Sequence, residues 1–289
     1  NTLVTISKFV AFSLSGSSSM MAESIHSLAD TTNQVLLLIG IKRSVRPPTK
    51  LFKFGFGQER YFWNLVSACG IFFIGCGVTV YHGVTNLFGE HQPEIGLLTI
   101  LVLPLALVIE GSVLIIALRS TWRQKGDLSL FEFMRTTPDP TLIAVVLEDL
   151  AALLGLLIAG AGILLTHLTG NAIFDSIGSV LVGVLLGLIA LFLANQNRKL
   201  LIDQSSPRSE AASRAALDGH SAVARIVDLR TVIFAPEQVL LVADLTFTDE
   251  ALEAPGAATD EIEQAIRAVA PEVKDIYIEV EQLRGRKRS

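Results

Sequence analysis

Six long apolar segments, separated by polar breaks, constrain the fold of this chain more than any other feature of its sequence. None of them shows a strict alternation of apolar and polar residues, so they indicate helices rather than the strands of a barrel. Hydrophobic residues make up 51% of the chain, too many for an ordinary soluble domain. The sequence therefore predicts a polytopic α-helical membrane protein with six transmembrane helices. The segments cover roughly residues 1–16, 20–41, 61–88, 95–118, 140–167 and 172–197.

The first apolar segment is shorter than the other five. It ends at Gly16, whereas a helix needs about 20 apolar residues to cross a bilayer. The chain also begins with Asn1 rather than with Met, so we expect the natural N-terminus to lie upstream of this sequence.

Basic residues occur only in alternate breaks between the segments. The breaks at 17–19, 89–94 and 168–171 contain neither Lys nor Arg. Because cytoplasmic loops are enriched in Lys and Arg, we expect both termini in the cytoplasm and a multi-pass protein of the plasma or inner membrane. The basic residues of the other breaks are Lys42, Arg43, Arg46, Lys50, Lys53, Arg60, Arg119, Arg123, Lys125, Arg135, Arg198 and Lys199.

The C-terminal part of the chain is richly charged and differs from the apolar part. Its elements read, in order, as a helix at Pro207–Leu217, strands at Val223–Phe234 and Val239–Phe247, a helix opened by Asp260 as N-cap, and a strand at Ile276–Val280. This order predicts a small α+β domain in which two helices back a three-stranded sheet. We therefore expect a transmembrane domain over residues 1–200 and a cytoplasmic domain over residues 201–289. The net charge of −5 does not suggest nucleic-acid binding.

His26 and Asp30 form the polar centre of the second apolar segment. Four residues apart on a helix, they share one face at a separation of roughly 6 Å along the axis. An imidazole and a carboxylate at this spacing can hold a borderline divalent metal such as zinc. The alternative is a helix end whose polar residues meet water.

Five further acidic residues lie inside the apolar segments, where ionisable groups are costly and are candidates for function. Glu148 and Asp149 are adjacent in the fifth segment, so they need a partner, water or a cation. Glu23, Glu110 and Asp175 are candidates for a proton or ion pathway. For Asp175 the alternative is a helix cap, and for Glu110 it is an arginine partner or a protonated carboxyl group.

Several short motifs resemble a known family. The stretch Met21–Asp30, which follows Ser15–Ser17, is similar to the second-helix signature of the cation diffusion facilitators, a family of zinc transporters. Phe54–Arg60 resembles the glycine-containing entry to the third helix of that family. Further motifs resemble one branch of the family more narrowly, that of the ninth human zinc transporter. They are Tyr81–Val84, Asp139–Thr141, Leu147–Ala152, Thr169–Asn171 and Asp175–Ser179.

The resemblance implies a homodimer with six helices per protomer and a cytoplasmic metallochaperone-like domain. It also implies alternating-access export of a divalent metal, usually against protons, from a site on the second and fifth helices. Carried over residue by residue, that site comprises His26, Asp30 and Asp149. The usual fourth ligand falls on Val145, and Glu148 could replace it only if the helix were rotated or distorted, because adjacent residues are offset by about 100°.

The C-terminal region departs from the family in its metal ligands. Residues 201–289 contain one histidine, His220, and no cysteine. We therefore expect this domain to dimerise without the zinc that the family usually binds there.

Together these features predict a secondary transporter that exports divalent metal cations, zinc foremost, by proton antiport. The metal is its substrate, and we expect no cofactor. Its expected partners are a second copy of the chain, the metal ion, protons and the lipid bilayer. A membrane enzyme is disfavoured, because the sequence has no HExxH motif and no nucleophile–base pair. Two alternatives stay open: the same fold could carry manganese, iron or cobalt, which suit oxygen-rich sites, or the chain could be a transport-inactive scaffold that acts through its soluble domain.

Overall fold

The structure is a computed structural model that describes residues 2–88, 97–126, 129, 133 and 140–281. The chain divides into two compact units. The first contains Asn1–Arg43 and Glu59–Arg198, and the second contains Ser44–Gln58 and Lys199–Ser289. The predicted break at 89–94, the residues Arg135 and Asp139, and the basic tail from Arg284 lie outside the described residues.

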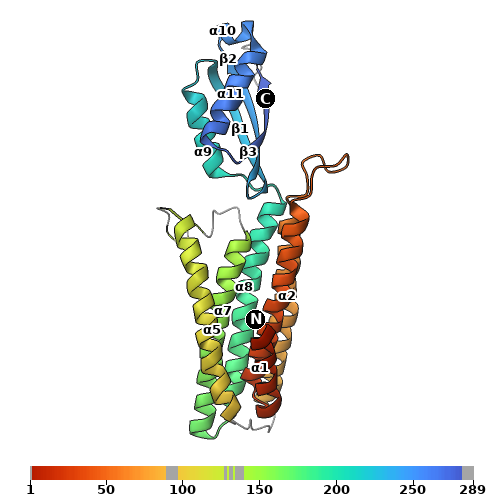
Figure 1. Ribbon diagram of the computed structural model, residues 1–289, viewed down its shortest axis with the longest axis vertical. Helices are drawn as coiled ribbons and strands as arrows, with labels where there is room; N and C mark the ends of the chain where they lie inside the picture. The colour runs from red at the N-terminus through yellow and green to blue at the C-terminus, as the bar shows by residue number, and fades with distance from the viewer. Residues whose placement is uncertain (1, 89–96, 127–128, 130–132, 134–139, 282–289) are drawn as a thin grey trace. The chain divides into compact units, whose positions relative to one another are not determined.

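The first unit consists of helices that run alongside one another (Figure 1). Each of the six predicted apolar segments corresponds to one helix or to one continuous run of helices. In order they are α1 (Thr2–Ser15), α2 (Ser18–Ser44), the run of α3 (Glu59–Gly70), the π-helix η1 (Ile71–Val78) and α4 (Thr79–Leu87), then α5 (Leu97–Gln124), α7 (Pro140–Thr169) and α8 (Ile173–Leu201).

Four of these helices are long and apolar enough to cross a membrane: Glu59–Leu87, Leu101–Arg123, Leu142–Thr169 and Ile173–Leu201. Helix α1 is apolar but shorter, and the 27-residue α2 is more polar. The chain is thus a helical membrane-type protein with four such helices in its described part and a small C-terminal α+β region.

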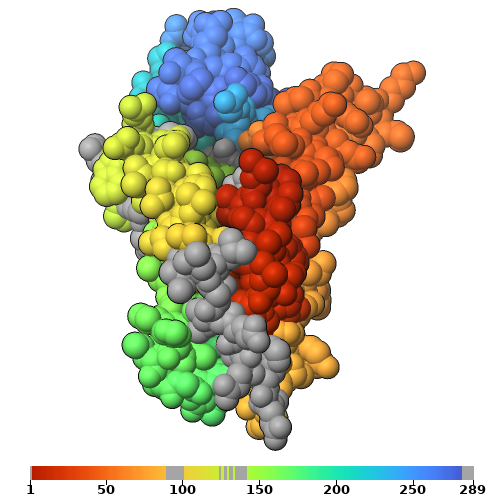
Figure 2. Space-filling view, turned by 60° about the horizontal axis from the view of Figure 1, so that its bottom comes forward, coloured from red at the N-terminus to blue at the C-terminus, as the bar shows by residue number. Residues whose placement is uncertain are grey.

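Helix α1 has an apolar outer face and a polar inner one. Leu3, Ile6, Val10 and Leu14 recur at helical spacing and are all exposed, whereas Thr5, Lys8, Ala11 and Ser15 are buried. Figure 2 shows α1, in red, at the surface of the unit beside α5, in yellow. The polar inner face of α1 is therefore turned toward α2 and α5.

The core of this unit positions the polar residues of α2 and α7. A cluster of buried apolar residues joins α2, η1, α7 and α8: Ala22, Ile71, Ala151, Val182, Leu186 and Ala190. Small residues allow helices to approach closely. A methyl group at Gly183 or Gly187 of α8 would come within 2.8 Å of Val80 or Cys76 of the third helical run. Ala22 and Ala151 lie next to the polar residues of α2 and α7, so this packing brings those polar residues between the helices.

The second unit is an α+β fold with a three-stranded sheet, as the sequence predicts. Its elements are α9 (Pro207–Asp218), β1 (Val223–Ala235), β2 (Gln238–Phe247), α10 (Asp249–Glu253), α11 (Pro255–Val269) and β3 (Val273–Val280). The strand order is β1-β2-β3, with β1 antiparallel and β3 parallel to β2. A parallel pair needs a crossover connection, and α10 and α11 supply it.

Three details of this unit differ from the sequence prediction, the first being that β3 begins at Val273 rather than at Ile276. Helix α11 begins at Pro255 rather than at Asp260, because proline is favoured in the first helical turn. The short helix α10 was not predicted, although the side chain of Thr248 caps it by accepting a hydrogen bond from the N–H of Ala251 over 3.4 Å.

The loop between α2 and α3 belongs to the second unit. Phe54 stacks on Phe234 at the end of β1, with 5.0 Å between ring centroids. The Nε2 of Gln238 donates a hydrogen bond to the carbonyl of Phe54 over 3.2 Å. Gly57 lies so close to the sheet that a methyl group there would be 2.6 Å from the carbonyl oxygen of Phe234. The loop is therefore packed against the turn between β1 and β2.

Candidate metal site

His26 and Asp30 lie together on α2, as their spacing predicts. The distance between His26 Nε2 and Asp30 Oδ2 is 3.5 Å. His26 is 1% exposed, and within the described part of the chain neither of its ring nitrogens has a hydrogen-bond partner. Buried polar atoms in proteins are nearly always hydrogen-bonded, because leaving one unpaired costs about 1–3 kcal/mol. A metal ion bound to a ring nitrogen would remove this cost.

Glu148 of α7 contacts α2 through Asn33. The amide nitrogen of Asn33 donates a hydrogen bond to Glu148 Oε2, and the hydroxyl of Ser67 on α3 donates one to Asn33 Oδ1. Asn33 lies three residues after Asp30, on a similar face of α2. The helical offset between Glu148 and Asp149 thus does not keep Glu148 away from α2.

Asp149 is half-buried in α7, one residue after Glu148. Its Oδ2 is buried and, among the residues that the structure describes, has no hydrogen-bond partner. Val145, one turn earlier, is also partly buried. Asp149 therefore has the unsatisfied buried oxygen expected of a ligand.

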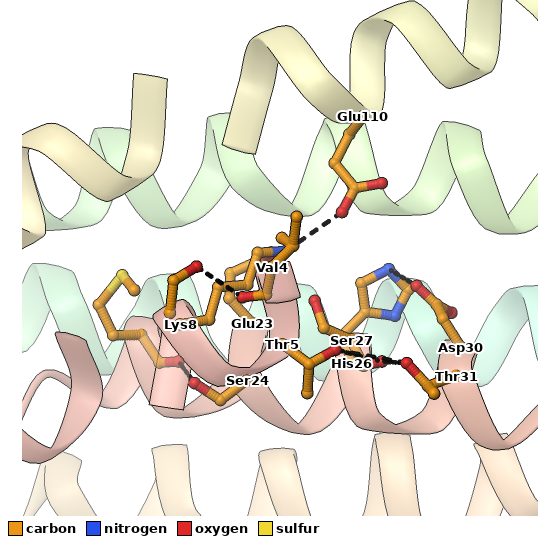
Figure 3. A network of polar contacts seen from close by, with 12 residues as sticks. Val4, Thr5, Lys8, Glu23, Ser24, His26, Ser27, Asp30, Thr31 and Glu110 are labelled. Carbon is orange, nitrogen blue, oxygen red and sulfur yellow. Dashed lines mark hydrogen bonds and ion pairs between the residues drawn. The ribbon is translucent and has the colours of Figure 1, made fainter. Parts of the chain in front are cut away.

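Glu23 and Glu110 share an ion-pair partner that the sequence analysis did not identify. Lys8 Nζ lies 3.0 Å from Glu23 Oε2 and 3.6 Å from Glu110 Oε1. The side chains of Lys8 and Glu23 are fully buried, and that of Glu110 is 9% exposed. Figure 3 shows Lys8 between the two carboxylates, with His26 and Asp30 farther along α2. The partner of Glu110 is thus a lysine of α1 rather than an arginine.

A sequence signal for Lys8 exists. It is the single Lys or Arg inside the six apolar segments of the sequence. Asn33, the other missed residue, is an amide at the start of the apolar half of α2 and three residues from Asp30. Both could have been identified as costly polar groups that need a partner inside a membrane.

Asp175 at the start of α8 caps the N-terminus of α2. Its carboxylate accepts hydrogen bonds from the Ser17 hydroxyl over 2.7 Å, from the Ser18 N–H over 2.6 Å and from the Ser19 N–H over 3.2 Å. The first N–H groups of a helix lack intrahelical partners and attract a negative charge. These bonds account for the burial of Asp175 without any cation.

The conformation described does not gather three metal ligands around one point. Among the described residues, no group of three or more His, Cys, Asp or Glu side chains could hold one metal ion. His26 and Asp30 are together, and Glu148 faces the same helix through Asn33. The set of His26, Asp30 and Asp149, with Glu148 as a further ligand, therefore stays a prediction.

Comparisons with known proteins identify relatives of the chain. Residues 1–202 match the cation efflux transmembrane domain. The human mitochondrial proton-coupled zinc antiporter SLC30A9 is 38% identical over 244 residues, which cover 83% of this chain and 43% of that protein. Metal tolerance protein C4 of Arabidopsis thaliana is 36% identical over 254 residues, which cover 86% of this chain and 55% of that protein. The chain thus spans about half the length of these curated relatives.

Proposed function

The chain belongs to the cation efflux family, near the branch of the zinc antiporter SLC30A9, and from that premise we propose that it is a secondary transporter that exports divalent metal cations. The family is one of transporters and not of enzymes, as the sequence predicts. One observation carries the proposal for this chain: His26 is fully buried beside Asp30, and its ring nitrogens have no hydrogen-bond partner in the described structure.

Zinc is the first substrate to test. It binds imidazole nitrogen and carboxylate oxygen, and His26 and Asp30 offer one of each. Two further carboxylates on α7 could complete a four-ligand site if α7 moved relative to α2. Glu148 already contacts α2 through Asn33, three residues after Asp30.

Proton antiport follows from the chemistry of these ligands. A metal binds only deprotonated imidazole and carboxylate groups, so its binding releases protons and protonation releases the metal. The same side chains can then carry metal in one direction and protons in the other. The name of the human relative refers to proton-coupled zinc antiport, and that of the plant relative refers to metal tolerance. Both names agree with this proposal.

For the topology, we propose six membrane-spanning helices, both termini in the cytoplasm, and a dimer formed through residues 201–289. The two helices in question are α1 and α2. The outer face of α1 is apolar, and the polar residues Glu23, Ser24, His26 and Ser27 of α2 are all buried. Both helices would therefore present a mainly apolar face to lipid, which is the requirement for crossing a bilayer.

Manganese, iron(II) or cobalt is a second candidate substrate. One imidazole and several carboxylates form an oxygen-rich set, and harder divalent ions prefer oxygen ligands. A transport-inactive scaffold is a candidate from another functional class. Val145 favours it, because the family resemblance implies that a metal ligand usually occupies this position.

Metal flux in proteoliposomes under an imposed pH gradient tests the proposal and separates these candidates. We expect zinc flux in the unmodified protein, and severe loss of flux in His26→Ala, Asp30→Ala and Asp149→Ala. Glu148→Gln should reduce flux or change its pH dependence. The control is His167→Ala, which removes an exposed histidine at the end of α7.

Each outcome has a meaning for the proposal. Flux of manganese but not of zinc would assign the second substrate. Wild-type flux in all three alanine variants would place the site elsewhere. A folded, inserted protein that moves no divalent ion under any gradient would favour the scaffold.

A further inference from the structure

Lys8 is a buried lysine whose ammonium group lies where a metal ion could lie. It is 0% exposed, and its two ionic partners come from different helices, Glu23 from α2 and Glu110 from α5. A buried ammonium is stable only when it is paired, because its removal from water costs several kcal/mol. The pair of carboxylates is therefore the part of the structure that keeps Lys8 inside the helix bundle.

One oxygen of the carboxylate pair lies close to a glycine of α7 and has no hydrogen-bond partner among the described residues. A methyl group at Gly155 of α7 would come within 2.5 Å of Glu23 Oε1, so the absence of a side chain at Gly155 gives this oxygen its space. Glu23 Oε1 is buried and has no hydrogen-bond partner among the described residues. Carboxylate oxygens without nitrogen donors are the ligands that hard divalent cations prefer. Without Lys8, this position would resemble a small all-oxygen cation site.

This position adjoins the proposed metal site. Glu23 lies three residues before His26 on α2, less than one helical turn away. Figure 3 shows the two groups of residues side by side along α2. Hydrogen bonding by Thr5 reinforces the contact between α1 and α2, because the Thr5 hydroxyl donates to the Ser27 carbonyl over 3.2 Å.

We propose that Lys8 is a specificity-determining residue: its ammonium group fills the Glu23–Glu110 carboxylate pair, so that a divalent cation can bind only beside it, at His26 and Asp30. This inference rests on the proposed function for the neighbouring site. Lys8 with Glu23 and Glu110 carries one net negative charge, which is too little to hold a divalent ion as well. Replacement of Lys8 by a neutral residue would leave two negative charges, which match a divalent cation.

The test measures how many manganese ions the protein binds in detergent, by equilibrium dialysis after removal of metal. Mn²⁺ is the probe because it favours oxygen ligands. We expect Lys8→Met to bind about one more Mn²⁺ per protomer than the unmodified protein, at a site of two carboxylates. Lys8→Arg keeps the positive charge and should bind the same number as the unmodified protein. Lys8→Met/Glu23→Gln restores the net charge and should lose the additional ion.

Two results would overturn the inference. One is an equal Mn²⁺ stoichiometry in Lys8→Met and in the unmodified protein. The other is an additional ion that persists in Lys8→Met/Glu23→Gln. If Lys8→Met folds poorly, its melting temperature must rise with Mn²⁺ concentration more than that of the double variant, and equal responses would also refute the proposal.

A different result would contradict the proposed function. An unmodified protein that binds neither Zn²⁺ nor Mn²⁺ would contradict the proposed function. The difference between Lys8→Met and its controls would still report on Lys8 alone.

Discussion

The buried polar side chains of α2 differ in how far the protein itself satisfies them. The helix N-terminus is satisfied by Asp175, and Asn33 is engaged on both sides by Glu148 and Ser67. The ring nitrogens of His26 have no hydrogen-bond partner among the described residues, and its ionic neighbour is Asp30, with 3.5 Å between Nε2 and Oδ2. Glu23 Oε1 and the Ser27 hydroxyl also lack hydrogen-bond partners among the described residues, but His26 is the side chain of α2 with both of its polar atoms buried and unpaired there.

Asn33 is expected to position Glu148 rather than to touch the transported ion. Asn33→Ala would remove the hydrogen bond that holds Glu148 against α2, and loss of such an outer partner typically lowers metal affinity or activity about 10–100-fold. Metal affinity measured by titration, together with flux, checks this. The matched control is Thr32→Ala, because Thr32 is exposed and bonds only within its own helix. Equal affinity in Asn33→Ala and Thr32→Ala would contradict the positioning role.

The sequence allowed the polar residues of α2, α5 and α7 to be identified but not their partners. Glu23, His26, Asp30, Glu110 and Glu148 stand out because each is a costly group in an apolar segment. Which carboxylate meets which cation depends on the packing of helices far apart in the sequence. For that reason Lys8 was missed, and the lysine partner of Glu110 was not among the alternatives considered for it.

At the scale of helices, the segment boundaries could be predicted because apolar runs and polar breaks are local features. The π-helix η1 could not, because a shift from i+4 to i+5 bonding leaves no mark in a uniformly apolar run. The same holds for the close contacts of Gly155, Gly183 and Gly187. A glycine in an apolar helix shows that close approach is possible without showing which helix approaches.

Gly155→Ala tests the contact between α7 and the Glu23 carboxylate. The added methyl group would come within 2.5 Å of Glu23 Oε1, so Glu23 must shift away from Lys8 or α7 must shift away from α2. We expect a destabilisation of about 1–3 kcal/mol, the usual cost of overpacking, measured as a lower melting temperature in detergent.

Gly160→Ala on the same helix is the control. No atom lies within 4 Å of its added methyl group, so this change should be neutral or stabilising by about 1 kcal/mol, because alanine favours helix. Equal melting temperatures for the two variants would show that Glu23 can move freely.

Gly57→Ala tests the packing of the loop Ser44–Gln58 on the sheet of its own unit. The new methyl group would lie 2.6 Å from the backbone carbonyl oxygen of Phe234, which cannot move aside as a side chain could. We expect faster cleavage within the loop by a protease, because detachment would expose its backbone. Gly256→Ala, in open space at the start of α11, should be cleaved at the original rate. Slower or unchanged cleavage in Gly57→Ala would refute the contact.

At the scale of the whole molecule, the oligomer is expected to be independent of metal in the C-terminal region. Residues 201–289 contain no Cys and one His, and Nδ1 of His220 already accepts a hydrogen bond from the Ala222 N–H over 3.2 Å. We therefore expect a chelator to leave the elution volume of a dimer unchanged in size-exclusion chromatography. A shift to the monomer after chelation would mean that metal ligands from elsewhere in the chain hold the dimer.

The loop Ser44–Gln58 also limits which segments of the chain can be exchanged between related proteins. The chain passes from one unit to the other between residues 43 and 44, 58 and 59, and 198 and 199, so the C-terminal unit is not one continuous stretch of sequence. A gene fusion that exchanged only the segment after Arg198 would bring in a foreign sheet and leave the native loop behind, including the glycine that fits beneath Phe234. We therefore expect this lineage to have kept the loop and the C-terminal segment together, and chimeras to fold only when both come from the same parent.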